Sequence, residues 1–308
     1  MSIAARVFVM FVACIVAGYG SEAEAGKTVK VVTSFSVLGD IVKNIGGDRV
    51  DVTTLVGPNG DVHVFEPTPA AAKAVYEADL AIVNGLGLEG WVDRLIKTSG
   101  YKGMVAVASK GVKPREMEDE EHGSGGKSDR TVTDPHAWQD IRNGVLYVDN
   151  ILEALSSSDP SSAAAFKANA EAYKAKLIEL DKWVRSEFSG IPVQNRRMIT
   201  THDAFGYFGA AYGVSSLAPM GISTESEPSA GDVKKLIRQI KKEKITAVFL
   251  ENVSDPRMIE AIAKESGVTL GGELFSDALS KPDGPASTYV DMFKNNVSKI
   301  VAAMKNGL

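Results

Sequence analysis

The chain has 308 residues, of which 44% are hydrophobic and 24% are charged, and its formal net charge is -5. This length and hydrophobic content are sufficient for two lobes, each with a core of its own. The net charge is mildly acidic and the basic residues are scattered along the chain. The sequence therefore lacks the clustered basic residues that are typical of a nucleic-acid-binding protein.

The N-terminus predicts a secretory signal peptide over residues 1–25. Arg6 supplies a positive start, residues 7–16 form an apolar run, and Ala23-Glu24-Ala25 offers small residues at a cleavage site. We therefore expect a periplasmic protein whose mature chain begins near Gly26 and does not insert into the membrane, because no later segment approaches about 20 apolar residues. The single cysteine, Cys14, lies inside this segment, so we expect no disulfide, and lipid anchoring at Cys14 is the less favoured alternative.

After residue 26, apolar runs alternate with segments of helical spacing. Strands are predicted at 29–33, 52–56, 80–83 and 104–108, and helices at 34–44, 70–78 and 88–99. Strands that alternate with helices predict a parallel sheet that helices cover on both faces, which is the α/β class.

Two histidines of this half lie in loops that prolines constrain. His63 belongs to the loop 58–69, where Pro67 and Pro69 lack the backbone donor, so the loop cannot continue as a helix or as a central strand. The turn residues at 59–61 place His63 at the carboxyl end of a strand, where open α/β sheets bind ligands. His136 directly follows Pro135, just before a helix that is expected to begin near Ile141.

The segment 113–133 interrupts the alternation of strands and helices. Acidic residues at 116 and 118–121 precede His122 and a glycine-rich stretch, and apolar periodicity is lacking. This composition predicts a mobile acidic loop. The loop is either a solvated insertion without a role or a transient trap in which its carboxylates and His122 capture a cation.

A long helix is predicted over residues 159–189. Asp159-Pro160 gives a helix start, and apolar residues then recur three or four positions apart as far as Phe188. About 30 residues at about 1.5 Å each make a rod of roughly 45 Å, which can cross a molecule of two lobes and join them stiffly. We therefore predict an N-terminal lobe over 26–158, a linking helix over 159–189 and a C-terminal lobe over 190–308.

The alternating pattern returns in the second half. Strands are predicted at 197–201, 214–217, 247–250 and 268–271, and helices at 204–212, 230–242 and 255–264. His202 lies at the end of the first of these strands, and Asp277 lies just past the last one. Asp277 is the weakest candidate ligand, because the same half contains competing acids, namely Glu225, Glu227, Glu251 and Asp255.

Three histidines and a carboxylate at such positions could converge on one cleft. Any one of them alone is more often an ordinary hydrogen-bonded or surface residue. Together, neutral imidazoles and a carboxylate suit Zn²⁺, with ligand bonds of about 2.0–2.2 Å in a tetrahedral shell.

The chain resembles the metal-binding receptors of bacterial ABC importers for zinc and manganese, known as cluster A-I solute-binding proteins. The resemblance extends from about Val29 to the C-terminus. The segments that carry it are 57–69, Asp134-Pro135-His136-Ala137-Trp138, 201–208, 221–229 and Asp277-Ala278-Leu279.

The resemblance implies two Rossmann-like lobes joined by one long helix, with metal held between them by His63, His136, His202 and Asp277. It also implies an ABC permease with its ATPase as partners. Within the family the chain is most similar to the zinc receptors, of which AztC and ZnuA are examples; manganese receptors carry Glu where this chain has His202, and hard oxygen ligands suit Mn²⁺ better than a third imidazole does. Zn²⁺ is therefore the expected cargo, with Mn²⁺ as the alternative. Zinc receptors often have a histidine-rich loop, whereas the corresponding insertion here is acidic.

Other functions are less favoured. A secreted zinc hydrolase would need an open metal position, whereas four protein ligands close the shell and describe a carrier. The glycine-rich stretch 85–90 looks like a dinucleotide fingerprint but lacks its context. A metal-dependent adhesin is a third class of function.

We expect a monomer and no enzyme activity, with a loading metallochaperone as a further candidate partner. Metal affinity is expected to fall as the pH drops through about 6.5, the ordinary pKa of histidine. Release is expected to involve either small shifts of the lobes or movement of the loop that carries Asp277.

Overall fold

The computed structural model describes residues 28–118 and 131–305. The predicted signal peptide with Cys14, and His122 within the acidic segment, lie outside the described residues. Within them, no helix combines the length and the hydropathy needed to cross a membrane.

The first half of the chain builds a parallel sheet. Its strands are β1 (Val29–Phe35), β2 (Val50–Val56), β3 (Leu80–Val83) and β4 (Met104–Val107). They lie in the order β2-β1-β3-β4 and all run parallel. Every residue of β3 is buried, as expected for an inner strand between two layers of helices.

The second half builds a second parallel sheet of the same topology. Its strands are β7 (Arg197–Ile199), β8 (Ser215–Leu217), β9 (Ala247–Glu251) and β10 (Leu270–Leu274). Their order is β10-β9-β7-β8, so the first strand of each sheet lies between the second and the third. The predicted α/β class and the doubled pattern are thus both confirmed. The strand order therefore reverses at the first strand of each sheet, β1 or β7. Open α/β sheets bind ligands at the carboxyl ends of the strands at such a switch point.

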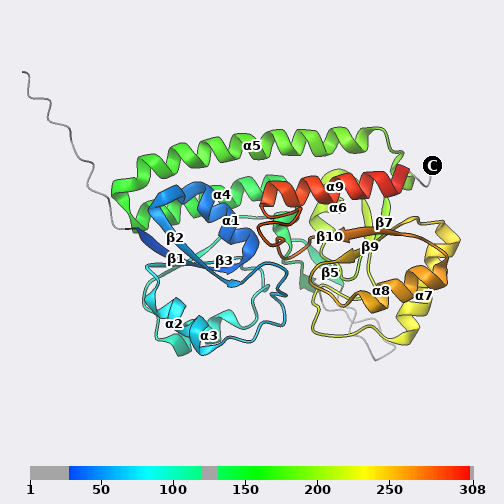
Figure 1. Cartoon of the computed structure of the whole chain (residues 1–308), viewed down its shortest axis with the longest axis horizontal. Coiled ribbons are helices and arrows are strands. Elements are labelled where there is room, and N and C mark those ends of the chain that lie inside the picture. Colours follow the sequence, from blue (N-terminus) through cyan, green and yellow to red (C-terminus); the bar gives the residue numbers. More distant parts are fainter. Residues whose placement is uncertain (1–27, 119–130, 306–308) are drawn as a thin grey trace, which may run out of the picture.

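Helices cover both faces of each sheet (Figure 1). In the view of Figure 1, α1 and α4 lie above the first sheet and α2 and α3 below it, while α6 and α9 lie above the second sheet and α7 and α8 below it. Their bounds are α1 Ser36–Gly46, α2 Pro69–Glu77, α3 Val92–Ser99, α4 Ile141–Ser158, α6 Gly206–Tyr212, α7 Ala230–Glu243, α8 Pro256–Ser266 and α9 Tyr289–Lys305. Helix α9 was not foreseen from the sequence.

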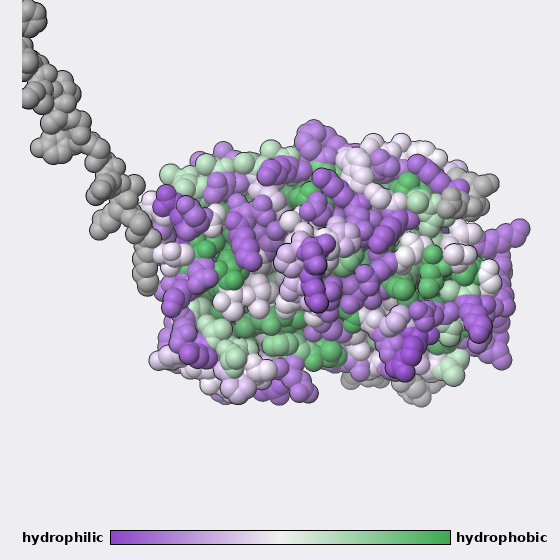
Figure 2. Space-filling view, in the orientation of Figure 1, coloured by the Kyte–Doolittle hydropathy of each residue, from purple (hydrophilic) through white to green (hydrophobic). Residues whose placement is uncertain are grey.

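Helix α5 (Ala163–Ser189) runs along the top of both halves in Figure 1. Its 27 residues span about 40 Å at about 1.5 Å per residue. It packs against α1 and α4 in the first half and against α6 and α9 in the second. The predicted apolar stripe forms its inward face, since the following positions are buried: Phe166, Ala170, Tyr173, Leu177, Leu180, Val184 and Phe188. The other face meets solvent, and the surface in Figure 2 shows hydrophilic areas interspersed with hydrophobic ones.

Two local details differ from the sequence-based expectation. The Asp159 side chain caps a short 3-10 turn, Pro160–Ser162, and α5 begins only after this turn. The predicted acidic loop 113–133 is not loop throughout, because β5 (Glu116–Glu118) and β6 (Thr131–Thr133) pair antiparallel at its two ends. The remaining short 3-10 turns are Gly47–Arg49, Ala137–Gln139 and Val193–Asn195.

Candidate metal centre

The structure brings together all four side chains that the sequence singled out. One ligand-capable atom from each of His63, His136, His202 and Asp277 lies within 4.8 Å of the others, and all four residues are buried. Among the described residues, no other group of at least three His, Cys, Asp or Glu side chains is arranged in this way. The first two come from loops of the first half and the last two from loops of the second half, so the cluster lies between the sheets.

His63 is positioned by a turn and by an aromatic support. Its backbone N–H donates to Oδ1 of Asp61 at 2.9 Å, which fixes the loop after β2. One residue earlier, the carbonyl of Val62 accepts a hydrogen bond from Nε1 of Trp91 at 2.8 Å. The indole also packs against the ring of Phe65, with centroids 4.8 Å apart. The loop is therefore held from both sides of the histidine.

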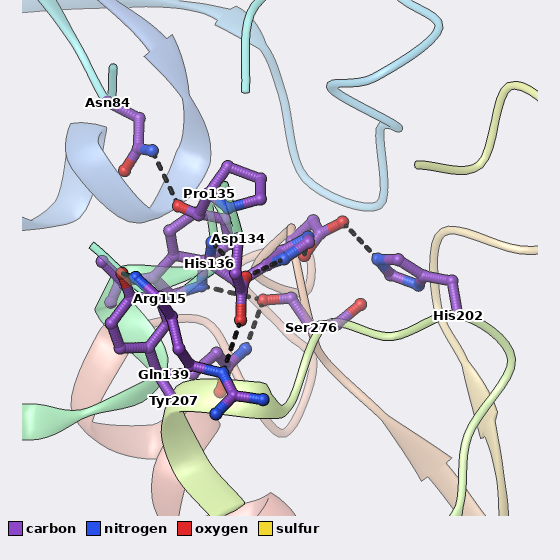
Figure 3. Close-up of polar contacts among 12 residues, drawn as sticks. Asn84, Arg115, Asp134, Pro135, His136, Gln139, His202, Tyr207 and Ser276 are labelled. Carbon is purple, nitrogen blue, oxygen red and sulfur yellow. Dashed lines mark hydrogen bonds and ion pairs between the residues drawn. The ribbon is translucent and has the colours of Figure 1, made fainter. Parts of the chain in front are cut away.

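His136 is held by a carboxylate behind its ring (Figure 3). Oδ1 of Asp134 accepts the backbone N–H of His136 at 3.0 Å and lies 2.9 Å from its Nδ1. The other oxygen, Oδ2, accepts from Nε of Arg115 at 3.3 Å. The peptide between them is fixed as well, because Asn84 Nδ2 donates to the carbonyl of Pro135 at 2.9 Å. A carboxylate at Nδ1 leaves Nε2 free to face the cluster.

His202 has a similar support from the neighbouring strand. Glu251 is the last residue of β9, which lies beside β7, and its Oε1 accepts the backbone N–H groups of Thr201 and His202 at 2.7 and 2.9 Å. Its Oε2 lies 2.8 Å from Nδ1 of His202. The ring of His202 therefore points Nε2 toward the cluster, opposite His136 in Figure 3.

Asp277 belongs to the second half but is fastened to the first. The carbonyl of Ser276 accepts hydrogen bonds from Trp138 Nε1 at 3.0 Å and from Gln139 Nε2 at 2.8 Å. Two residues after Asp277, the backbone N–H of Leu279 donates to Oγ of Ser36 at 2.9 Å. Both carboxylate oxygens are fully buried and accept no well-formed hydrogen bond from the described residues. A buried carboxylate without donors is costly, and a cation between it and the imidazoles would remove that cost.

Distances within the cluster fit a small coordination shell. A tetrahedron with ligand bonds of about 2.0–2.1 Å has edges of about 3.3–3.4 Å. The Nε2 atoms of His63 and His136 are 3.4 Å apart. The carboxylate oxygens of Asp277 lie 3.2, 3.6 and 3.0 Å from Nε2 of His63, His136 and His202. One divalent cation at the centre could reach all four side chains without large movements.

The buried charges alter proton affinities in the metal-free cluster. Burial lowers the pKa of His136, but the carboxylates of Asp277 and Asp134 raise it more strongly, to about 9. Burial likewise lowers the pKa of His202, and Glu251 and Asp277 raise it well above its ordinary value. Burial raises the pKa of Asp277, whereas the neighbouring His202 and His136 hold it well below its usual range. Without metal, the site therefore holds protons at neutral pH.

The supporting roles of Asp134 and Glu251 were not foreseen from the sequence. Asp134 belongs to the segment 134–138 that carries the family resemblance, and its spacing of two residues before His136 is typical of a side chain that accepts a backbone N–H. Glu251 was considered only as a competing ligand, although its place at the end of a strand next to β7 was a usable signal. The other competing acids, Glu225, Glu227 and Asp255, are exposed.

Comparisons with known proteins agree with this architecture. The family model for the periplasmic zinc-uptake complex component A matches residues 31–303. The manganese-binding lipoprotein MntA of Halalkalibacterium halodurans is 35% identical over 300 residues, which cover 96% of this chain and 96% of that protein. The manganese ABC transporter substrate-binding lipoprotein PsaA of Streptococcus mitis is 32% identical over 308 residues, covering 96% and 97%.

Solved structures are similar over most of the chain. The periplasmic zinc-binding protein TroA of Treponema pallidum is 32% identical, with a TM-score of 0.81 that covers 90% of this chain and 99% of that one. The Mn-bound periplasmic metal-binding protein of Candidatus Liberibacter asiaticus is 30% identical, with a TM-score of 0.78 and coverage of 90% and 100%. The chain therefore belongs to the family of the zinc-uptake complex component A, whose members are extracytoplasmic substrate-binding receptors of metal ABC transporters and not enzymes.

Proposed function

We propose that the chain captures Zn²⁺ outside the cytoplasm with His63, His136, His202 and Asp277 and delivers it to the permease and ATPase of an ABC importer. The observation that carries this proposal is that three imidazole nitrogens and one carboxylate lie together in a buried cluster. The distances between these atoms are close to the edge lengths of a tetrahedral zinc shell. Four protein ligands leave no open position for a reacting water, which suits a carrier.

The donor set supports zinc as the cargo. Imidazole nitrogen suits Zn²⁺, whereas carboxylate, carbonyl and water oxygens suit Mn²⁺. The cluster offers three nitrogens, and the nearby carboxylates of Asp134 and Glu251 face the backs of two rings and not the centre. Among the described residues, Asp277 alone supplies oxygen to the cluster.

Manganese is the second candidate, and two observations favour it. Several relatives of 31–35% identity are named as manganese-binding proteins. Both oxygens of Asp277 also face ring nitrogens, Oδ2 toward His63 and His202 and Oδ1 toward His136, so a chelating carboxylate could raise the coordination number above four. A larger shell with more oxygen suits Mn²⁺.

Metal content separates the two candidates better than a simple comparison of affinities does. Most nitrogen and oxygen sites bind Zn²⁺ more tightly than Mn²⁺, whatever their physiological cargo. We therefore expect protein isolated from its native compartment under metal-limited growth to contain one equivalent of zinc. The variant His202→Glu should bind zinc more weakly and should move the ratio of the Zn²⁺ and Mn²⁺ dissociation constants toward manganese. Manganese in the native protein, or an unchanged ratio in the variant, would refute the zinc assignment.

The mode of attachment outside the cytoplasm is part of the proposal. A free periplasmic protein would be cut after Ala25, whereas an anchored one would begin at Cys14 and carry lipid on that cysteine. The relatives named above include lipoproteins, which supports the anchored form more than the sequence alone does. The intact mass of the mature protein distinguishes a chain that begins at Gly26 from a lipid-modified chain that begins at Cys14.

A further inference from the structure

The loop that carries His63 is fastened to the opposite half of the molecule. Residues 57–68 follow β2 of the first sheet, yet three hydrogen bonds join them to segments of the second half. These bonds are Asn59 N to Leu279 O at 3.0 Å, Asn252 Nδ2 to Asn59 Oδ1 at 3.0 Å, and Thr224 Oγ1 to Asp61 Oδ2 at 2.6 Å. Two of the three involve Asn59, which occupies the left-handed region with φ of 58° at the tip of the turn.

Asp61 connects this fastening to the metal cluster. Its Oδ1 accepts the backbone N–H of His63, and its Oδ2 accepts the hydroxyl of Thr224. One half-buried carboxylate therefore fixes a candidate ligand and, at the same time, bonds to the loop between β8 and α7. Hydrogen bonds to a charged acceptor are the stronger kind, so this bond is the firmest of the three.

His63 depends on its loop more than the other two histidines do. His136 and His202 each have a carboxylate at Nδ1, Asp134 and Glu251 respectively. For Nδ1 of His63, the described part of the chain provides no hydrogen-bond partner. His63 is also 7% exposed, whereas His136 and His202 are 0% exposed. The orientation of its ring is therefore set mainly by the backbone that Asp61 holds.

A cavity borders the Asp61–Thr224 bond. It has a volume of about 530 Å³ and is lined in part by Asp61, Thr224, Thr201 and Ser254. Thr201 precedes His202, so the cavity reaches the backbone next to the cluster. Its size admits water and a hydrated cation. Both partners of the bond therefore border open space, and one of them, Asp61, also accepts the backbone N–H of the candidate ligand His63.

We propose that Asp61 and Thr224 are positioning residues that form a latch, and that this latch sets how long the metal stays bound. With the latch closed, His63 completes the shell. When the Thr224 hydroxyl leaves Asp61, the loop moves toward the cavity, His63 leaves the metal first, and water takes its place. This inference rests on the proposed metal-binding function, and it assigns release to a local movement in place of a separation of the halves.

The test measures the rate of Zn²⁺ dissociation into excess chelator by stopped flow. Thr224→Val keeps the shape of the side chain but removes the donor, and we expect dissociation to accelerate about tenfold or more. Thr224→Ser keeps the hydroxyl and should release zinc at nearly the wild-type rate. Asn59→Gly removes one side-chain bond while tolerating the left-handed backbone, and should accelerate release more modestly.

Two further measurements separate a latch from general loosening. The matched control is Thr246→Val, because the Thr246 hydroxyl donates to the carbonyl of Ala303 at 3.3 Å within the second half, away from the cluster. This control should leave the release rate unchanged. The visible spectrum of the Co²⁺-loaded Thr224→Val variant should match that of the wild type, since the ligands stay the same.

Each outcome decides the question. Wild-type release rates in both Thr224→Val and Asn59→Gly would overturn the latch, as would equal acceleration by Thr224→Ser or by the Thr246→Val control. An altered Co²⁺ spectrum in Thr224→Val would assign the effect to a changed ligand set and would also overturn it. If the wild-type protein binds no zinc, the proposed function fails, and the latch fails with it.

Discussion

Zinc binding at neutral pH should expel protons from the site, and this sets the affinity. The pKa of His136 is raised to about 9 in the metal-free protein, so at pH 7 its ring is protonated and cannot act as a ligand. The pKa of His202 is raised as well. The physical cause in both rings is the buried negative charge of Asp277 and of the carboxylate behind each ring. The expectation from the sequence, a fall in affinity only below about pH 6.5, is therefore replaced by a dependence that reaches higher pH.

The size of the effect follows from the pKa of His136. A pKa about two units above pH 7 leaves about 99% of the rings protonated, so the apparent affinity at pH 7 is lower by about 100-fold, or about 3 kcal/mol, than well above pH 9. Binding at pH 7 should release about one proton from His136, and His202 should add up to one more. The apparent affinity should thus rise between about tenfold and 100-fold per pH unit from pH 7 to pH 8.

Isothermal titration calorimetry in buffers of different ionisation enthalpy counts these protons. Zinc should be delivered from a chelator of known affinity, which prevents hydroxide from competing at high pH. The variant Asp277→Asn provides the internal control: it lacks the charge that raises both histidine pKa values, so it should release fewer protons. An affinity that is flat above pH 7, with much less than one proton released by the wild type, would refute the account of the metal-free cluster.

The same pKa predicts the pH dependence of stability without metal. A histidine whose pKa is raised on folding stabilises the protein fully below its unfolded pKa of about 6.5, and this contribution is lost as the pH rises through about 9. The Tm of the metal-free protein should therefore fall between pH 6.5 and 9. The zinc-loaded protein has no such proton to lose, so its Tm should show no corresponding fall.

Three further predictions concern the groups around the ligands. Glu251→Gln should weaken zinc binding about 10- to 100-fold in a chelator competition, because it weakens the support behind a ligand, whereas the exposed Glu265→Gln should leave affinity unchanged. Gly206→Ala should also weaken binding, since its Cβ would lie 2.5 Å from Oδ2 of Asp134, and Gly90→Ala, with open space around its Cβ, is the control. Small-angle scattering should give nearly equal radii of gyration with and without zinc, and a large contraction on binding would contradict a local release.

Much of the fold could be predicted because its signals are local. Apolar runs that alternate with helical spacing gave the order of the elements, and β3 was placed at its observed bounds, Leu80–Val83. Seven of the stripe positions in α5 are buried as expected, because a 3.6-residue period needs no tertiary information. Helix α9 was missed, although its sequence contains buried apolar positions at the same spacing, such as Met292, Phe293 and Val297.

The candidate ligands could be found for a related reason, while their environment could not. Rigid loops at the carboxyl ends of parallel strands are recognisable from prolines and turn residues, and His63, His136 and His202 occupy such places. Which carboxylate stands behind which ring depends on the packing of neighbouring strands, which a sequence does not specify. The raised pKa of His136 was unforeseeable for that reason, since it comes from Asp277, 141 positions later in the chain.

The distribution of contacts between the halves decides where the molecule can open. One continuous hydrophobic core contains Trp138 from the first half and Phe208 and Phe293 from the second, so a wide separation of the halves would expose buried apolar surface. It would also break the buried hydrogen bonds from Trp138 and Gln139 to the carbonyl of Ser276, at about 1–3 kcal/mol for each group left unpaired.

The side-chain hydrogen bonds that join the loop of His63 to the second half are of another kind. The bond between Asn59 and Asn252 is exposed, and the one between Thr224 and Asp61 is only partly buried, so water can replace each partner when the bond breaks. Because opening follows the least costly route, the loop should move while the core, α5 and the segment of Asp277 stay in place. A receptor built in this way should release an ion from the proposed cluster without unpacking the interface between its halves.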